Sequence, residues 1–547
     1  MNQETLDKKI YIKSVIMIVI MALAVAILQG NPYTSVAFGA PRQVQVLMLF
    51  LVSILATGIW GYKVKTGKLS YEGGLLFTVF FGTLMRVGYV LFVDIQTLQN
   101  DGGTFTGYGT SQINDGHIGY IEYIYKFFHL PDMDPYEHFG YYHPPFHHII
   151  EALWLTVQRF IGVPEKFAFE NLQVPTLIYS ALCMVVMLHI LEESGVKKNL
   201  MAAGLALFAF HPRMMVLAGS VNNDILALLL LLVTIWRTLS WIHEKTFKNV
   251  ILIALALGFG MISKLNTAIC AFSIAVLFLV CLINRIKDAN TVKIKEIILQ
   301  YVVFGVICIP IGLSYIVRNI VFFGEKPGIP SPAIIPNESV MYTGEFSVWS
   351  IIGIPSFADW HVAFPFHPLS AKAIHNTWVI LFQTGLFAEI YPAGASDHLL
   401  SAAQIAYVSS IILALVTTVV FLVGFVRRFF KEFPADRECF AVTGFLWLTY
   451  VFMLLSFGLY VFKYPYTCSS DFRYMTASLV FTSLGYVLCR GGAGGIIGSR
   501  DANSGVSEGE AVKKSGAAAG IFGYVMKMLM ILTLGCSLVF YIGWFLG

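Results

Sequence analysis

Long apolar runs recur along the whole chain of 547 residues. Each run approaches the about 20 residues that a helix needs to cross a bilayer. Only 12% of the residues are charged, and the net charge is +4 without a basic patch, whereas soluble domains contain about 25% charged residues. We therefore predict an all-α polytopic membrane protein with about 13 spans and exclude a soluble or nucleic-acid-binding protein. The predicted spans are 11–29, 44–60, 72–93, 171–192, 200–218, 221–242, 248–264, 267–285, 298–322, 403–426, 438–461, 472–489 and 521–546.

The distribution of lysine and arginine predicts the topology, because cytoplasmic loops are enriched in both residues. Lysines precede the first span and separate the second from the third, which places residues 94–143 outside the cell. Five later basic loops fall inside only if the apolar segment 145–162 does not cross the membrane. We therefore interpret 145–162 as an interfacial helix that extends the first external loop to about residue 170. The N-terminus is then inside and the C-terminus outside.

This topology divides the chain into four parts. Residues 1–71 provide two extra N-terminal helices, and residues 72–490 form the main transmembrane region. The Gly/Ser-rich stretch 491–519 is interpreted as a flexible cytoplasmic linker, and 520–547 as a C-terminal transmembrane helix. Within the main region, residues 94–170 and 323–402 form two large external loops, of which the second is rich in Pro and Gly.

Two aspartates of the first external loop are candidates for a catalytic carboxylate. Asp101 lies in QNDGGTF, directly after the third predicted span. A carboxylate there can act as a general base or ligate a divalent metal, although a solvated loop aspartate would show the same pattern. Asp115, in INDGHIGYIEYI, is the second candidate, and its alternative role is to cap the helix that follows.

Two further polar motifs lie at the outer ends of predicted spans. The first places Tyr142 and His143 before two prolines that fit the first turn of a helix. These aromatic residues either anchor that helix or line a cleft, and no HExxH pattern or cysteine accompanies them to suggest zinc. The second motif, SVNND, ends in Asn223 and Asp224. It is either an ordinary capping turn or a second acidic element that faces Asp101.

Several cations lie where the positive-inside bias disfavours them. Arg86 lies in the outer half of the third span. Four further cations lie at outer span ends, namely Lys264, Arg318, Lys463 and Arg473. A cation at the centre of a span costs roughly 2.5–3.5 kcal/mol on insertion scales. These residues either pair with acids such as Asp224, Glu389 or Asp471, or bind an anionic headgroup. The run KYPYTCSSDFRY, which ends at Tyr474, places two cations and three tyrosines on one outer loop, and this favours recognition of phosphate and sugar.

With these motifs the chain resembles the GT-C superfamily of polytopic glycosyltransferases. It is most similar to the bacterial glycosyltransferase family 39-like proteins, which are related to protein O-mannosyltransferases and to the aminoarabinose transferase of lipid A. The matching elements are QNDGG, FGYYHPPFHHIIEALW and YPYTCSSDFRYM, within residues 72–490. The SVNND motif stands where oligosaccharyltransferase catalytic subunits have Asp-Asn-Glu, a departure that weakens the expectation of a metal site.

The resemblance implies a GT-C-type fold whose large first external loop carries interfacial helices. It also implies an inverting transfer of a sugar from a polyprenyl-phosphate donor to an envelope glycan, lipid or protein, on the outer face of a bacterial plasma membrane. Asp101 would be the base, with Asp115 in reserve. Arg318, Lys463 and Arg473 would stabilise the departing phosphate. Glu389 would bind the acceptor, a metal or a cation, while His143 and its neighbouring tyrosines would line the cleft. Mg²⁺ or Mn²⁺ is compatible with this chemistry without being required.

Two other functions fit parts of the sequence. A transporter or flippase of lipid-linked glycans predicts ionisable residues near the membrane midplane and broken helices in corresponding halves of the chain. Here the polar residues gather at one face, which favours an enzyme. A polymerase or ligase of envelope glycans would use similar donors, but its large outer loop is expected late in the chain.

Overall fold

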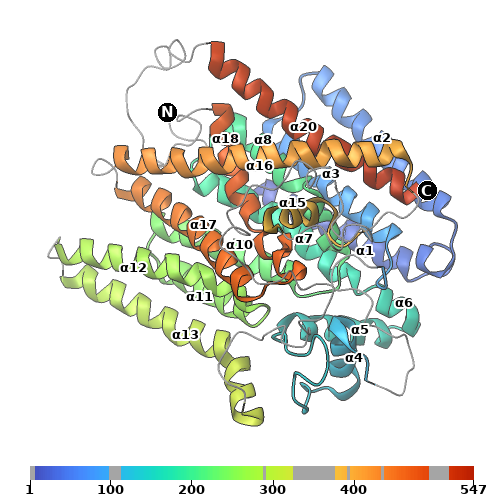
Figure 1. The fold of residues 1–547 in the computed structure, drawn as a ribbon, viewed down its shortest axis with the longest axis horizontal. Helices are drawn as coiled ribbons and strands as arrows, with labels where there is room; N and C mark the ends of the chain where they lie inside the picture. Colours follow the sequence, from blue (N-terminus) through green and yellow to red (C-terminus); the bar gives the residue numbers. More distant parts are fainter. Residues whose placement is uncertain are drawn as a thin grey trace.

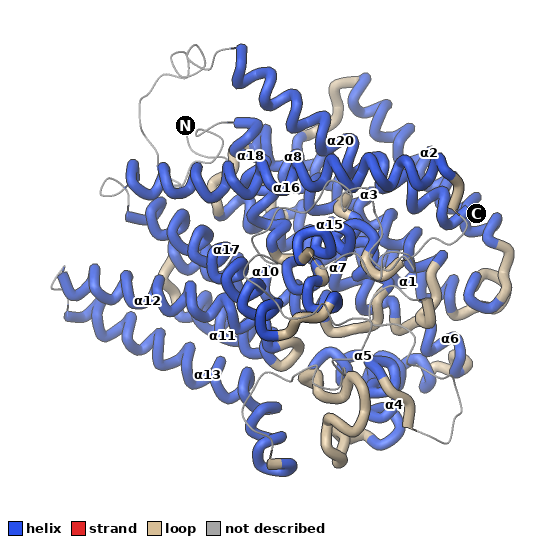
Figure 2. Tube along the Cα trace, viewed as in Figure 1, coloured by secondary structure: helices blue, strands red, loops and turns tan. Residues whose placement is uncertain are grey.

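The computed structural model describes residues 6–97, 113–287, 291–324, 376–390, 395–432, 437–491 and 517–546. These residues form helices joined by turns and loops, and none of them belongs to a β-strand (Figures 1 and 2). The prediction of an all-α polytopic membrane protein is thus confirmed. Asp101, most of the second external loop and the linker around 492–516 lie outside the described residues.

The long helices follow the predicted apolar runs. Ten are long and apolar enough to cross a membrane within the described part of the chain, and a bent pair could form an eleventh span. The predicted count of about 13 is not confirmed, because α11 and α18 are shorter than 18 residues. The principal helices are α1 (Lys9–Gln29), α2 (Arg42–Lys65), α3 (Tyr71–Phe92), α7 (Gln173–Glu193), α10 (Asp224–His243), α11 (Phe247–Met261), α12 (Ile269–Lys287), α13 (Thr291–Phe323), α16 (Asp397–Glu432), α17 (Arg437–Lys463), α18 (Ser478–Gly491) and α20 (Ala517–Leu546).

One predicted span is broken. The segment 200–218 forms α8 (Lys198–Ala209) and α9 (Pro212–Gly219), whose axes differ by 50°. Pro212 explains the break, because it lacks the backbone N–H that would continue the helix and fits the first turn of a new one. The side chain of His211 accepts a hydrogen bond from the backbone N–H of Arg213 and so caps α9.

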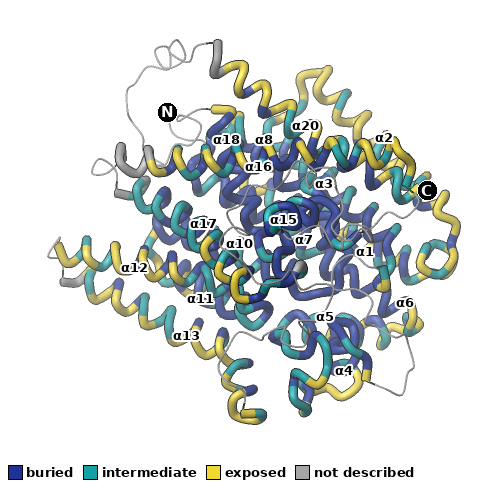
Figure 3. Tube along the Cα trace, viewed as in Figure 1, coloured by how far each residue is buried: buried dark blue, intermediate teal, exposed yellow. Residues whose placement is uncertain are grey.

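Burial follows the position of each helix in the bundle (Figure 3). Helices α7 and α10 run through the middle and bury apolar side chains such as Leu188 and Leu232. By contrast, α2, α12, α13 and α20 expose many large apolar side chains to the outside. In a membrane protein such faces contact lipid, because lipid tails are as apolar as these side chains.

The segment that we predict to be external, and continue to call the first external loop, forms its own layer of helices at one end of the bundle (Figure 1): α4 (Gly116–Phe127), α5 (Phe146–Phe160) and α6 (Glu165–Glu170). The α5 helix covers the predicted interfacial segment and is not among the helices able to span the membrane. One face of α5 is buried, while Leu153, Val157 and Phe160 on the other face are exposed. This amphipathic pattern is typical of a helix that lies in the membrane interface.

Backbone contacts join this layer to the ends of the spans. The backbone N–H of Phe146 donates to the carbonyl of Ile262, just after α11, at 3.0 Å. The hydroxyl of Tyr315, near the end of α13, donates to the carbonyl of Tyr141 at 2.8 Å. The turns before α10 and after α11, the end of α13 and the helices α4–α6 therefore meet at one end of the bundle, which we call the site end.

Candidate functional site

An acid and a base from two different turns meet at the site end. Asp224 is the first residue of α10, and Lys264 precedes the short helix η2 (Leu265–Ala268). The ammonium of Lys264 donates a hydrogen bond to the carboxylate of Asp224, and both residues are buried. The two turns are held together by Asn223, whose side-chain amide donates to the carbonyl of Ser263 at 2.6 Å.

The second part of the site comes from the far end of the sequence. Short helix η5 (Phe472–Met475) brings Arg473 and Tyr474 to the pair. The Lys264 ammonium nitrogen lies 4.9 Å from the centre of the Tyr474 ring, and the Arg473 guanidinium carbon lies 5.2 Å from the same centre. Two cations thus contact one aromatic ring, an arrangement that holds positive charge beside an electron-rich surface.

A buried ion pair fixes η5 in place. The Arg213 guanidinium of α9 donates to the Asp471 carboxylate at 2.8 Å, and the same carboxylate accepts a 2.6 Å hydrogen bond from the backbone N–H of Arg473. Arg213 also donates to the carbonyl of Thr384 in α15 (Thr377–Phe387) at 3.2 Å. We call the Arg213–Asp471 pair the brace, because it joins α9, α15 and η5 behind the site.

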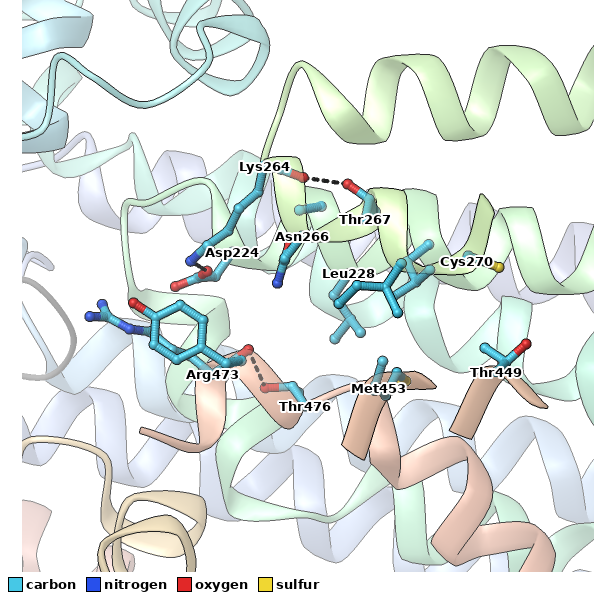
Figure 4. A pocket seen from close by; sticks show the side chains of 15 residues that line it. Asp224, Leu228, Lys264, Asn266, Thr267, Cys270, Thr449, Met453, Arg473 and Thr476 are labelled. Carbon is cyan, nitrogen blue, oxygen red and sulfur yellow. Dashed lines mark hydrogen bonds and ion pairs between the residues drawn. The ribbon is translucent and has the colours of Figure 1, made fainter. Parts of the chain in front are cut away.

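A cavity of about 30 Å³ lies between these elements. In Figure 4, Lys264 points towards Asp224, while Arg473 and Thr476 come from the ribbon on the other side. The cavity is lined by both polar and apolar side chains: Asp224, Ala227, Leu228, Leu231, Lys264, Asn266, Thr267, Ile269, Cys270, Thr449, Met453, Arg473, Tyr474, Thr476 and Ala477. This volume accommodates about two water molecules.

Histidines and tyrosines form a stacked cluster beside this cavity. The His117 and His143 rings stack with centres 4.8 Å apart, and the His117 and His148 ring nitrogens lie 2.9 Å apart in a hydrogen bond. The Tyr120 ring stacks on His148, with ring centres 4.3 Å apart. Neighbouring His147 is close enough to Asp224 for that carboxylate to oppose the lowering of the His147 pKa by burial. We call His117, His143, His147 and His148 the histidine cluster.

Asp115 takes a different role from the cap that its sequence allows. It occupies the N-cap position of α4, but its side chain forms no capping hydrogen bond. Instead the carboxylate contacts the ring nitrogen of His138 at 2.7 Å, and both side chains are partly exposed. A carboxylate in this position orients the imidazole ring. Sequence reasoning did not select His138.

The structure places five predicted substrate-binding residues at the cavity. Four of them line it, namely Asp224, Lys264, Arg473 and Tyr474, and the fifth, Asn223, holds a supporting turn in place. Tyr142 and His143 lie in the first external loop, with ring centres 4.7 Å apart. Neither residue lines the cavity.

The remaining predicted residues lie outside the cavity lining. Arg318 reaches the first external loop and donates to the carbonyl of Pro131. Lys463 is exposed and stacks over Tyr464 at 5.2 Å. Glu389 is partly buried in the turn after α15. Asp101 lies outside the described residues.

Arg86 differs most from its predicted role in substrate binding. It is completely buried, and its guanidinium donates to the hydroxyl of Ser180 at 2.8 Å and to the carbonyls of Gly82 and Ala209. These contacts join α3, α7 and α8 in the bundle interior. The prediction that Arg86 needs partners holds, but its partners are the neighbouring helices rather than the residues of the cavity.

Within the described part of the chain, no group of three or more His, Cys, Asp or Glu residues is arranged to hold a metal ion. Asp224 faces a lysine, and the histidine cluster contacts aromatic rings. These donor sets do not fit Mg²⁺ or Mn²⁺, which prefer several oxygen ligands.

Sequence reasoning also missed Arg213 and Glu151. Arg213 lies inside the predicted span 200–218, where a cation needs a partner, and the adjacent proline marks the break that exposes it to Asp471. Glu151 lies four residues after His147 in the predicted interfacial helix, and this spacing places both on one face of α5.

Comparison with known proteins supports the predicted class. Residues 143–313 match the family model described as dolichyl-phosphate-mannose-protein mannosyltransferase. The matched segment includes His143, Asn223, Asp224 and Lys264, and it ends before Arg318 and Arg473. The match confirms the predicted resemblance to membrane glycosyltransferases over this segment, which is less than half of the chain.

Solved structures of similar proteins give a partial overlap. The oligosaccharyltransferase of Archaeoglobus fulgidus is 12% identical, with a TM-score of 0.45 over 85% of this chain and 55% of that protein. ArnT of Cupriavidus metallidurans bound to undecaprenyl phosphate is 14% identical, with a TM-score of 0.33 over 76% of this chain and 78% of that protein. The chain thus spans about half the length of the oligosaccharyltransferase. At these TM-scores no residue role is transferred. No curated protein matches the chain.

Proposed function

We propose that this protein transfers a sugar from a polyprenyl-phosphate donor to an acceptor of the cell envelope, on the outer face of a bacterial plasma membrane. The observation that carries the proposal is the convergence of Lys264, Arg473 and Tyr474 on one cavity at the site end. The family match adds the donor class, because its description names a lipid-phosphate-linked sugar. An acceptor glycan, lipid or protein is compatible with the site.

The cations of the cavity suit the leaving group of this reaction. As the bond between the sugar and the phosphate breaks, negative charge grows on the phosphate oxygens, and fixed positive charge lowers the energy of that state. Arg473 can donate two parallel hydrogen bonds to a phosphate, whereas Lys264 supplies a compact charge. Because the cavity accommodates only about two waters, it would receive phosphate oxygens, and the sugar would lie outside it.

The acceptor side of the reaction requires a base. A hydroxyl oxygen of the acceptor attacks the anomeric carbon, the carbon–oxygen bond to phosphate breaks, and the electron pair leaves with the polyprenyl phosphate. The acceptor proton passes to a carboxylate, and attack opposite the leaving group inverts the configuration. We propose Asp101 as this base and Asp115, in contact with His138, as the alternative.

Purified protein in lipid nanodiscs and a panel of radiolabelled undecaprenyl-phosphate sugars test the function. We expect release of undecaprenyl phosphate with at least one sugar and a loss of about 10²- to 10⁴-fold in Asp101→Asn, as for other general bases. Transfer by Asp101→Asn at the parental rate would remove Asp101 from this role. If undecaprenyl phosphate neither binds nor is released, the proposed donor class is wrong.

A separate experiment tests the proposed side of the membrane. A cysteine placed at the exposed position of Phe160 should react with a membrane-impermeant reagent that is added outside intact cells. The same cysteine should stay unlabelled from the inside of the cell, which is tested by adding the reagent outside sealed inverted vesicles, because their outer surface is the cytoplasmic face. Labelling only from the inside would place the first external loop, and the site end with it, in the cytoplasm.

A further inference from the structure

One carboxylate lines the cavity beside two cations, and the mechanism above gives it no role. Among the described residues that form the lining, the charged side chains are Asp224, Lys264 and Arg473. Asp224 and Lys264 are buried and hydrogen-bonded to each other, and Arg473 contacts the same Tyr474 ring as Lys264. An anion in a pocket for phosphate is unexpected, because it repels the ligand that the cations attract.

The neighbouring titratable groups do not change this charge balance. Burial lowers the pKa of His147, which interacts with Asp224 from α5, to about 3, so the His147 ring is neutral near pH 7. Burial raises the pKa of Tyr474 well above its ordinary value, so its hydroxyl is also uncharged. The brace behind the site adds no net charge, because it consists of one cation and one anion. The described lining therefore carries one net positive charge.

The proposed reaction changes the charge of the ligand in this cavity. In the donor, phosphate joins the polyprenyl chain to the sugar as a diester with one negative charge. During transfer the acceptor oxygen bonds to the anomeric carbon and the acceptor proton passes to the base. The bond from that carbon to the phosphate oxygen breaks, and its electron pair stays on the oxygen. The product is a phosphate monoester, which carries about −1.5 to −2 charges at pH 7.

From this difference we propose that Asp224 makes the cavity favour the diester donor over the monoester product, and so promotes the release of polyprenyl phosphate. This inference rests on the proposed function. Asp224 repels a ligand in proportion to the charge of that ligand, so the second negative charge of the product adds a repulsion that the donor does not experience. Because the carboxylate is buried, water screens this repulsion less than it would at an exposed site.

A purely structural role for Asp224 predicts a different result. As the first residue of α10, Asp224 opposes the positive end of the helix dipole, and it also holds the ammonium of Lys264. Loss of either contact would disturb the lining and change the affinities for donor and product by the same factor. The repulsion alone depends on the charge of the ligand. The ratio of the two affinities therefore separates the two roles.

Two lipids that differ by one methyl group and one negative charge measure this ratio. They are undecaprenyl phosphate, a monoester, and undecaprenyl methyl phosphate, a diester. Quenching of tryptophan fluorescence in mixed micelles gives both dissociation constants at pH 8. In Asp224→Asn, the affinity for the monoester should rise at least about tenfold more than the affinity for the diester. At pH 5, where both lipids carry about one charge, the substitution should change both affinities by the same factor.

A charge-balanced variant tests the inference even if Asp224→Asn does not fold. Asp224→Asn/Lys264→Met removes one charge of each sign, so it leaves neither side chain as an unpaired buried charge and should keep the parental ratio. Arg473→Gln removes a cation alone, and the affinity for the monoester should fall about tenfold more than that for the diester. Glu170→Gln changes a buried carboxyl group outside the cavity lining and should leave both affinities unchanged. Circular dichroism and melting temperature establish folding.

The results distinguish this inference from the proposed function. If folded Asp224→Asn changes both affinities by the same factor at pH 8, Asp224 does not select between the ligands. The same conclusion follows if the double variant shifts the ratio as far as Arg473→Gln. If neither lipid binds to the parental protein, the proposed donor class is wrong, and this inference is wrong as well.

Discussion

Two acid–base pairs lie close together in this bundle and differ in their surroundings. The brace, Arg213 with Asp471, is buried, and one further hydrogen bond joins it to α15 and another to η5. The pair Lys264 with Asp224 lines a cavity, and its cation faces an aromatic ring that a second cation also contacts. An ion pair between a basic and an acidic side chain is thus structural in the brace, whereas the pair of Lys264 and Asp224 is accessible to a ligand from the cavity.

The comparison shows that charge alone does not identify a binding site. A buried cation that is surrounded by carbonyls and one carboxylate has its hydrogen bonds used within the protein. A cation beside a cavity can exchange part of its contacts for those of a phosphate. Four substitutions test this distinction between structural and ligand-binding charges. They are described from the largest expected change in stability or affinity to the smallest.

The largest effect should follow the loss of the brace. Arg213→Met leaves the Asp471 carboxylate buried without its cation, and we expect the free energy of unfolding to fall by about 3–5 kcal/mol. Denaturant titration in mixed micelles measures this change. The double variant Arg213→Met/Asp471→Leu should recover most of the loss, because it removes the unpaired charge. A loss below about 1 kcal/mol in the single variant would show that the brace is not structural.

Arg473→Ala should affect ligand binding more than stability. Arg473 is partly exposed and lines the cavity, and its removal costs one charged hydrogen-bonding group toward the phosphate. We expect binding of undecaprenyl phosphate to weaken about 10- to 100-fold, which corresponds to about 1.5–3 kcal/mol. Calorimetry or quenching of tryptophan fluorescence can measure the affinity. Unchanged affinity would place the phosphate elsewhere.

Glu151→Gln extends the comparison to a buried acid without a cation. Because burial raises the pKa of Glu151, the folded protein keeps a proton that the unfolded chain releases above its ordinary pKa of about 4.5. The parental protein therefore loses stability as pH rises above 4.5, with a slope of up to about 1.4 kcal/mol per pH unit until the folded pKa is reached. The variant lacks this loss, so its free energy of unfolding relative to the parent should increase with pH.

His147 changes stability in the opposite direction and provides the control for that measurement. Burial lowers its pKa to about 3 from an ordinary value of 6.5, so the folded protein loses stability as pH falls from 6.5 towards 3. Glu151→Gln should leave this acidic decline in place. If the stability difference between Glu151→Gln and the parent does not depend on pH between 5 and 8, Glu151 is ionised in the folded protein.

The smallest effect should come from Lys463→Ala. Lys463 lies only ten residues before Arg473 on the same outer segment, but it is exposed and absent from the cavity lining. Exposed charges are screened and contribute at most about 1 kcal/mol. We expect the affinity for undecaprenyl phosphate to change by less than about threefold. A loss as large as that of Arg473→Ala would move the phosphate site towards the exposed loop.

The sequence predicted the elements of the site better than their pairing. Successive spans cross the membrane in alternate directions. The distribution of lysine and arginine was therefore enough to predict that Asp224, Lys264 and Arg473 lie at the outer ends of spans. Packing then decides which of these residues meet, and sequence spacing does not contain that information. Asp471 was a predicted partner for an outer cation, but it pairs with Arg213, which is 258 residues away.

The apolar pattern also predicted most helices but not their interruptions. The hydropathy of residues 200–218 is the same whether they form one straight span or two short helices. The angle between α8 and α9 at Pro212 depends on how α9 packs against its neighbours, which hydropathy does not describe. The histidine cluster shows a similar limit. His143, His147 and His148 are visible as a motif, but His117, which stacks on one and binds another, lies on a different helix.

The contact between Lys264 and Tyr474 has a consequence for biosynthesis. A ribosome makes the chain from the N-terminus, and the segment that matches the family model ends at residue 313. The ring that completes the cavity belongs to residue 474 and is inserted much later. During synthesis the nascent protein therefore carries Lys264 and Asp224 without their partner ring, and a product truncated before η5 would lack the cavity.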